Sequence, residues 1–217
     1  MWACKRSFLM RIWTTPFCLT LLLIGRLASA AAPTTQPAAS ISGKISASAD
    51  IPNIEMVVYL VPAEGTAALP PPTTPVKVSQ HGAKFSPALA IITVGQQVDF
   101  VNDEERLIEH NVFSNAPPKR FDLGMYPPGQ SRSVVFDKPG AVLLYCSIHR
   151  YMDGVVFVTP SGLFSRVAPD GTYHIDNVPD GKWTLTTWQR RKRFKEISMP
   201  VQIEKGKSLS IDLELKK

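Results

Sequence analysis

The sequence has few cysteines and histidines, and it lacks a long apolar run. Its 217 residues include 3 Cys and 4 His. Cys4 and Cys18 fall within the first thirty residues, which leaves Cys146 as the single thiol of the rest of the chain. Between Arg11 and Arg26 lie 14 uncharged residues, fewer than the roughly 20 that a membrane-spanning helix requires. These shortages argue against a disulfide framework and against a transmembrane helix.

Residues 1–30 have the three parts of a secretory signal peptide. Basic residues come first, an apolar segment over residues 16–24 follows, and the small residues 28–30 provide a cleavage site. We expect cleavage near Ala31, export to the periplasm or the extracellular space, and no stable membrane span afterwards; an uncleaved anchor is the alternative. Residues 31–40 contain little to bury and are predicted to form a flexible leader.

Most of the basic excess of the sequence comes from this first segment. The whole chain has 24 Lys and Arg against 18 Asp and Glu. Four of the basic residues and none of the acidic ones lie in residues 1–30, so the remainder carries 20 basic and 18 acidic residues, a net charge of about +2. Nucleic-acid-binding proteins carry a marked basic excess, so we expect no nucleic acid as a partner.

Strand patterns follow one another after residue 40. Gly and Pro separate them and no helical period interrupts them, which predicts an all-β protein. Two strands are expected over residues 41–47 and 54–61. Residues 69–75 are rich in proline, which cannot donate the hydrogen bonds of a β-ladder, and are expected to form a linker or crossover. Residues 94–102 alternate apolar and polar side chains, as a half-buried strand does.

The stretch over residues 143–152 runs from an apolar strand into a loop with three metal-binding side chains. Cys146, His149 and Met152 follow one another at intervals of three residues. A cysteine thiolate, two imidazoles and a weak axial thioether are the ligands of electron-transfer copper sites, and His110 is a candidate for the second imidazole. An unpaired thiol in an oxidising compartment is a liability unless a metal holds it, although a lone cysteine can also be a small buried apolar residue.

The pattern Cys146-x-x-His149-x-x-Met152, preceded by His110-Asn111, resembles that of the blue copper proteins, the cupredoxins. Its tight spacing is most similar to that of amicyanin. The resemblance implies that Asn111 ties the two ligand loops together and that His149 is the exit for the electron. It also implies one type 1 copper, with His110, Cys146 and His149 as equatorial ligands and Met152 as the axial ligand.

The resemblance covers residues 75–160 and implies a cupredoxin Greek-key β-sandwich. Within this range, residues 117–129 also resemble secreted cupredoxin-like proteins known as methylamine-utilisation proteins, a name that assigns no role here. Met125 is a second thioether, but a lone methionine near a proline-rich loop is typical of packing. The charged residues 103–106 are expected to form a solvated turn before His110.

Residues 161–217 resemble a second fold, the carboxypeptidase-regulatory or transthyretin-like β-sandwich. The resemblance depends on Asp170-Gly171-x-Tyr173-x-Ile175 and on the later Val178-Pro179-x-Gly181-x-Trp183. Alone, this piece has few strands and a thin core, and residues 41–70 match the two strands with which that fold opens. We therefore expect one smaller sandwich built from both ends of the chain, with a copper domain of residues 71–160 inserted between them.

The leading hypothesis is a type 1 copper protein, not an enzyme, that carries single electrons between redox protein partners. A copper enzyme needs an open coordination position, usually built with further histidines, and only His81 and His174 remain. One alternative is a copper-binding or copper-delivery protein without electron transfer, although a Met-rich or His-rich tract is missing. A zinc site is another, but it does not call for Met152. The last is a sandwich for adhesion, with Tyr173 or Trp188 stacking on a carbohydrate.

Overall fold

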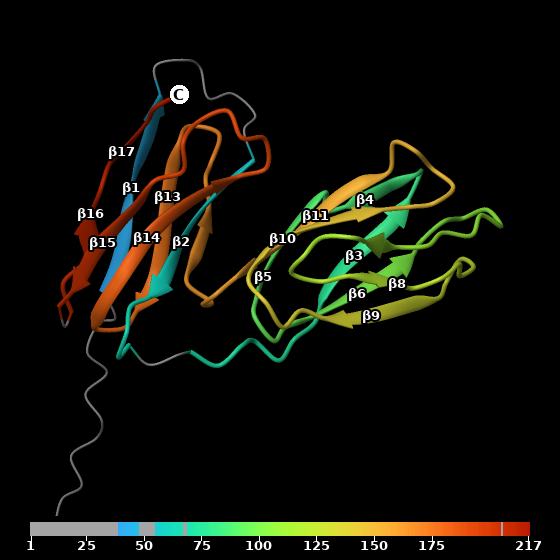
Figure 1. The fold of residues 1–217 in the computed structure, drawn as a ribbon, viewed down its shortest axis with the longest axis horizontal. Helices are drawn as coiled ribbons and strands as arrows, with labels where there is room; N and C mark the ends of the chain where they lie inside the picture. The colour runs from blue at the N-terminus through green and yellow to red at the C-terminus, as the bar shows by residue number, and fades with distance from the viewer. Residues whose placement is uncertain (1–38, 48–54, 67–68, 205) are drawn as a thin grey trace, which may run out of the picture. The chain divides into compact units, whose positions relative to one another are not determined.

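The computed structural model describes residues 39–47, 55–66, 69–204 and 206–217. The predicted signal peptide and residues 31–38 of the predicted leader lie outside the described residues. Every regular element within the described ranges is a β-strand, from β1 to β17, which confirms the all-β prediction (Figure 1). A helix with the length and apolar character needed to cross a membrane is absent from these ranges.

Strands β3 to β11 form two sheets, which we call the central sandwich. The five-stranded sheet has the order β5 (Leu89–Thr93), β11 (Asp153–Thr159), β10 (Gly140–Tyr145), β7 (Phe113–Ser114) and β8 (Phe121–Asp122). The four-stranded sheet has the order β4 (Lys84–Ser86), β3 (Val76–His81), β6 (Gln97–Asn102) and β9 (Ser131–Val135). Strands β10 and β11 are antiparallel neighbours, so the connection between them starts and finishes at the same end of the strand pair.

The two sheets of the central sandwich enclose one apolar core. On β6, Val98, Phe100 and Asn102 are buried and the residues between them are half-buried, as the alternating sequence predicts. Inner residues of both sheets contribute to the same cluster, and so do Cys146 and Met152 from the loop after β10. The first and last residues of the expected metal-binding loop therefore reach into the core, whereas Ile148 and Tyr151 between them are exposed.

The remaining strands form a second pair of sheets, which we call the flanking sandwich. One sheet has the order β13 (Thr172–Val178), β1 (Ala39–Ala47) and β16 (Leu209–Ser210), and β17 (Leu213–Leu215) also pairs with β1. The other has the order β12 (Phe164–Arg166), β2 (Met56–Pro62), β14 (Gly181–Gln189) and β15 (Ser198–Ile203). The two N-terminal strands thus lie between strands of the C-terminal part. Independent folding of residues 71–160, and a transthyretin-like origin of the flanking sandwich, stay predictions.

Strand β1 begins earlier than the sequence predicts. Ala39 and Ser40 belong to β1, although their composition places them in the flexible leader. Ala39 is buried and pairs with Val178, and the Ser40 amide donates a hydrogen bond to the Ser208 hydroxyl at 3.2 Å. Both partners come from the far end of the chain, so nothing near residue 39 in the sequence reveals them.

The aromatic residues of the flanking sandwich are packed against other groups. Tyr173 is buried, and its hydroxyl donates to the Ile211 carbonyl at 2.6 Å. Trp188 is buried and stacks on Phe157, with the ring centroids 4.2 Å apart. Neither Tyr173 nor Trp188 presents an open ring face to a carbohydrate. The alternative of sugar stacking by these two residues is therefore wrong.

Candidate metal centre

The predicted ligand loop is the connection between β10 and β11. Tyr145 and Asp153 pair across the two strands and close the loop of residues 146–152. Within it, the Met152 amide donates to the His149 carbonyl at 3.0 Å. Leu144 of β10 is buried, and Cys146, the first residue after the strand, continues its alternation and is also buried. A regular ladder thus holds both ends of the loop and turns the thiol inward.

His110 reaches the same place from another part of the chain. Its amide donates to the Tyr126 carbonyl at 3.2 Å, and the Tyr126 amide donates to the His110 carbonyl at 2.9 Å. Strand β7, which follows, pairs with β10 so that Phe113 lies opposite Tyr145. Because Tyr145 directly precedes Cys146, this pairing brings the segment of His110 next to the ligand loop.

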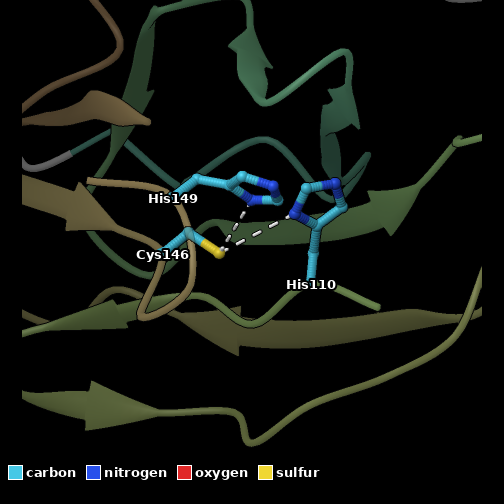
Figure 2. Close-up of side chains that lie close together, drawn as sticks. All are labelled: His110, Cys146 and His149. Carbon is cyan, nitrogen blue, oxygen red and sulfur yellow. Dashed lines mark hydrogen bonds between the residues drawn. The ribbon is translucent and has the colours of Figure 1, made fainter. Parts of the chain in front are cut away.

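Figure 2 shows the rings of His110 and His149 turned toward the sulfur of Cys146. The sulfur lies 3.7 Å from Nδ1 of His110 and 3.8 Å from Nδ1 of His149, and the three donor atoms lie within 4.8 Å of one another. Separations of this size suit three atoms bound to one ion at the usual metal–N and metal–S lengths of about 2.0–2.3 Å. One thiolate with two imidazoles is also the donor set that copper accepts. The residues therefore fit a copper ion.

The three side chains differ in their exposure to solvent. His110 and Cys146 are buried, whereas His149 is half-buried. His149 also borders a cavity of about 350 Å³, whose wall includes His81, Glu104 and Arg106. The cluster is therefore closed on the side of His110 and approachable on the side of His149.

Two methionines lie near this cluster. Met152 is fully buried and belongs to the same apolar core as Cys146; its role as the axial ligand stays a prediction. Met125 is 41% exposed, and its sulfur lies 3.9 Å from the Ser147 hydroxyl. Burial beside Cys146 favours Met152 over Met125 as a thioether donor to the same ion.

Asn111 connects the two segments that carry the cluster. Its side-chain oxygen accepts hydrogen bonds from the Ser147 amide at 2.8 Å and from the Ser147 hydroxyl at 3.0 Å. Its side-chain nitrogen donates to the Asp122 carboxylate at 3.2 Å. The predicted tie between the two ligand loops is thus confirmed, and Asn111 holds Ser147 directly beside Cys146.

The expectation that residues 103–106 form a solvated turn is wrong for Glu104. Its side chain is only 8% exposed, and its Oε1 lies 2.9 Å from Nε2 of His110. The hydrogen bond from His110 is the largest of the contacts that lower the pKa of the Glu104 carboxyl, while partial burial acts in the opposite direction. The sequence could not predict this contact, because four charged residues in a row give no indication that one of them is buried.

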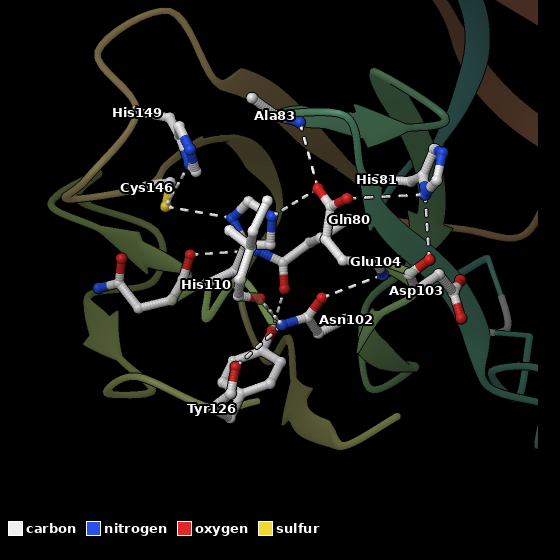
Figure 3. A network of polar contacts seen from close by, with 12 residues as sticks. Gln80, His81, Ala83, Asn102, Asp103, Glu104, His110, Tyr126, Cys146 and His149 are labelled. Atoms are coloured by element: carbon white, nitrogen blue, oxygen red, sulfur yellow. Dashed lines mark hydrogen bonds and ion pairs between the residues drawn. The ribbon is translucent and has the colours of Figure 1, made fainter. Parts of the chain in front are cut away.

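A network of buried polar side chains surrounds His110 (Figure 3). The Tyr126 hydroxyl donates to the Gln80 side-chain oxygen, and the Gln80 side-chain nitrogen donates to the Asn111 carbonyl at 3.2 Å. The Asn102 side-chain nitrogen donates at 2.9 Å to the carbonyls of Tyr126 and Ile108. Burial is the main cause that raises the pKa of Tyr126, so its hydroxyl keeps its proton and remains a donor. The network fixes the backbone on both sides of His110.

The other two histidines stand apart from the cluster. The His81 side chain is 57% exposed, and its Nδ1 lies 3.0 Å from the Asp103 carbonyl oxygen. His174 lies in the flanking sandwich and pairs with Asp176 at 2.7 Å. In the described part of the chain, the one group of three metal-binding His, Cys, Asp or Glu side chains is the cluster of His110, Cys146 and His149.

Comparison with solved structures finds copper proteins. A purple cupredoxin from Nitrosopumilus maritimus is 26% identical, and the match covers 39% of this chain and 99% of that one with a TM-score of 0.35. A copper-containing nitrite reductase from Thermus scotoductus is 31% identical, and the match covers 45% of this chain but only 24% of the reductase, with a TM-score of 0.37. A reduced amicyanin mutant is 20% identical, with coverage of 46% and 99% and a TM-score of 0.36.

These likenesses each cover less than half of the chain. No protein-family model matches the sequence, and no curated protein matches it either. Likenesses at these TM-scores are too slight to assign a function, so the function has to be inferred from the side chains of this chain.

Proposed function

We propose that this chain is a type 1 copper protein that accepts and passes single electrons without catalysing a reaction. The observation that carries the proposal is the buried triangle of Cys146 Sγ with the Nδ1 atoms of His110 and His149. Bound copper would supply a one-electron couple between Cu(II) and Cu(I). A soft thiolate with two imidazoles suits both oxidation states.

The protein frame supports this proposal because it restrains each donor separately. The β10–β11 ladder holds Cys146 and the ends of its loop. The bridge to Tyr126 holds the backbone of His110, and Asn111 links the two segments. Donors that are fixed in advance change little in position between two oxidation states, which favours rapid electron transfer.

The exposure of the cluster supports a direction for the electron. His149 is the half-buried member, and Ile148 and Tyr151 on the same loop are largely exposed. We infer that a redox protein docks on this side and that His149 is the exit. The proposed location is the periplasm or the extracellular space, as the signal-like residues 1–30 indicate.

Spectroscopy of the purified protein with one equivalent of Cu(II) tests the proposal. We expect an intense visible absorption from thiolate-to-copper charge transfer, together with an electron paramagnetic resonance signal of a single copper. Cys146→Ser should abolish the colour and leave the fold intact, since serine keeps nearly the same volume. Tyr151→Phe, at an exposed position of the same loop, is the matched control and should keep the colour. A colourless wild-type protein with full copper occupancy would overturn the proposal.

A second experiment distinguishes electron transfer from copper delivery, the alternative function. A delivery protein releases its ion to a competing thiolate or thioether site, whereas an electron carrier keeps it through many redox cycles. We expect the reduced protein to keep its copper for hours beside an equimolar apo-chaperone. Rapid loss of copper, with slow electron self-exchange, would favour delivery instead.

A further inference from the structure

Glu104 and Glu105 are neighbours in the sequence but differ in their surroundings. The Glu105 residue is exposed, whereas the Glu104 side chain is turned inward and 8% exposed. Figure 3 shows the Glu104 carboxylate directed at the ring of His110, on the side away from Cys146. The distance from Oε1 of Glu104 to Nε2 of His110 is 2.9 Å, which is that of a good hydrogen bond.

The turn between β3 and β4 is shaped to receive this carboxylate. Gly82 and Ala83 have φ angles of 58° and 53°, which lie in the left-handed region. Ala83 adopts this conformation although it has a Cβ, which is uncommon for a residue other than glycine. Its amide points at Oε1 of Glu104 from 3.4 Å, and the Gly82 amide also contacts the carboxyl. Successive amides in such a turn form a cradle for an anion.

The strand on the other side also restrains Glu104. Its amide donates to the side-chain oxygen of Asn102, the last residue of β6, at 3.2 Å. Backbone and side chain of Glu104 are therefore both held, one by β6 and the other by the β3–β4 turn. A carboxylate that is fixed in this way can orient the imidazole that donates to it.

We infer that Glu104 is a positioning residue that sets the tautomer of His110 and strengthens its Nδ1 as a donor. The inference rests on the proposed function. A carboxylate only accepts hydrogen bonds, so Nε2 of His110 carries the proton and the Nδ1 lone pair faces the sulfur of Cys146. Negative charge at Nε2 makes the imidazole a better donor. A better donor stabilises Cu(II) relative to Cu(I), so Glu104 lowers the reduction potential.

His81 is the other group near this carboxylate, and it does not take the same part. Its Nδ1 lies 3.8 Å from Oε2 of Glu104, beyond hydrogen-bond distance, and 3.0 Å from the Asp103 carbonyl. Its side chain is also largely exposed. His81 therefore lies within ion-pair distance of Glu104 but makes its hydrogen bond to the Asp103 carbonyl.

Glu104→Gln and its matched control Glu105→Gln test the inference by voltammetry of the copper-loaded protein. Both substitutions remove one carboxylate from the same turn. Contacts of this kind are typically worth 10–100-fold in metal affinity. A stronger imidazole donor favours Cu(II) over Cu(I), so for Glu104→Gln we expect the Cu(II) affinity to fall about tenfold more than the Cu(I) affinity. That difference raises the potential of a one-electron couple by about 59 mV. Glu105→Gln should change the ratio of the two affinities less than about threefold, because an exposed charge is screened.

A measurement without copper covers the case in which the variant fails to fold. In the metal-free wild-type protein, the ring nitrogen shifts of His110 should show a protonated Nε2 and a bare Nδ1. A bare Nε2 would overturn the inference, and so would equal potential shifts in the two variants. A wild-type protein that is blue and has an unaltered potential in Glu104→Gln contradicts only this inference, whereas a colourless wild type contradicts the proposed function.

Discussion

The central and flanking sandwiches differ in what they bury. Both enclose an apolar core between two sheets. Near the ligand loop, however, the central sandwich buries a group of polar side chains, namely Gln80, Asn102, His110, Asn111 and Ser114. In the flanking sandwich the buried Thr187 and Gln189 bind the backbone of the loop that follows β14. Burial of polar groups costs free energy unless they are hydrogen-bonded. The buried amides of Gln80 and Asn102 bond the backbone on both sides of His110, so the polar groups near the ligand loop hold the segment that carries a candidate ligand.

The largest expected effect concerns the independence of the two sandwiches. A fragment of residues 71–160 should fold and bind copper, because it contains both sheets of the central sandwich. A fragment of residues 161–217 should not fold, because it lacks β1 and β2, which lie between its strands. Thermal unfolding followed by circular dichroism measures both. Cooperative unfolding of the 161–217 fragment would show that the flanking sandwich does not need the N-terminal strands.

A substitution in the flanking core should lower the stability without changing the proposed copper site. Trp183→Ala removes a fully buried side chain from the flanking core and should lower the free energy of unfolding by about 3–5 kcal/mol. The copper spectrum of the folded fraction should be unchanged, since Trp183 belongs to the other core. Chemical denaturation and visible absorption of the same samples provide the two readings. Lys182→Ala, at the neighbouring residue, serves as the control for stability; a shifted copper band in Trp183→Ala would mean that the two cores are coupled.

A smaller loss of stability is expected from the polar network of the central sandwich. Tyr126→Phe removes the hydroxyl that donates to Gln80 and leaves the buried Gln80 oxygen without that donor. A group left unsatisfied in this way costs about 1–3 kcal/mol. Tyr145→Phe changes an exposed tyrosine of β10 and should alter the stability by less than about 0.5 kcal/mol. Equal unfolding midpoints for the two variants would contradict the role given to the network.

Substitution of Met152 should have the smallest effect on stability but should change the reduction potential of the bound copper. Met152→Leu nearly conserves volume and should cost less than about 1.5 kcal/mol, yet it removes a weak donor that stabilises Cu(II), so the potential should rise. Met152→Gln should lower it, because an amide oxygen is a stronger axial donor. Met56→Leu, a buried methionine of the flanking core, is the matched control and should leave the potential unchanged. If no Met152 variant moves the potential, Met125 becomes the candidate to test.

Local sequence predicted much of this molecule, but contacts between distant segments escaped it. The alternation along β6 and the spacing of Cys146, His149 and Met152 lie within a few residues of one another and are visible without a structure. The resemblance to cupredoxins predicted the contact of Asn111 with the second ligand loop. The burial of Glu104 could not be predicted, because it depends on a turn about twenty residues earlier in the chain, whose backbone conformation no residue near Glu104 reveals. The early start of β1 has the same cause, since its partners come from β13 and Ser208.

The pairing of Tyr145 with Asp153 closes the β10–β11 ladder, so residues 146–152 form a separate connecting loop. Because the ladder from Gly140–Val158 to Tyr145–Asp153 does not depend on the loop, we expect the sandwich to tolerate changes in the loop's length or composition if Cys146 and Met152 are replaced by residues that fill the core. Three of the four expected donors lie in this loop, whereas His110 lies outside it and is held by contacts with Tyr126 and Glu104. We therefore expect substitutions within residues 146–152 to change the donors of the proposed metal site, while His110 and its contacts with Tyr126 and Glu104 stay the same.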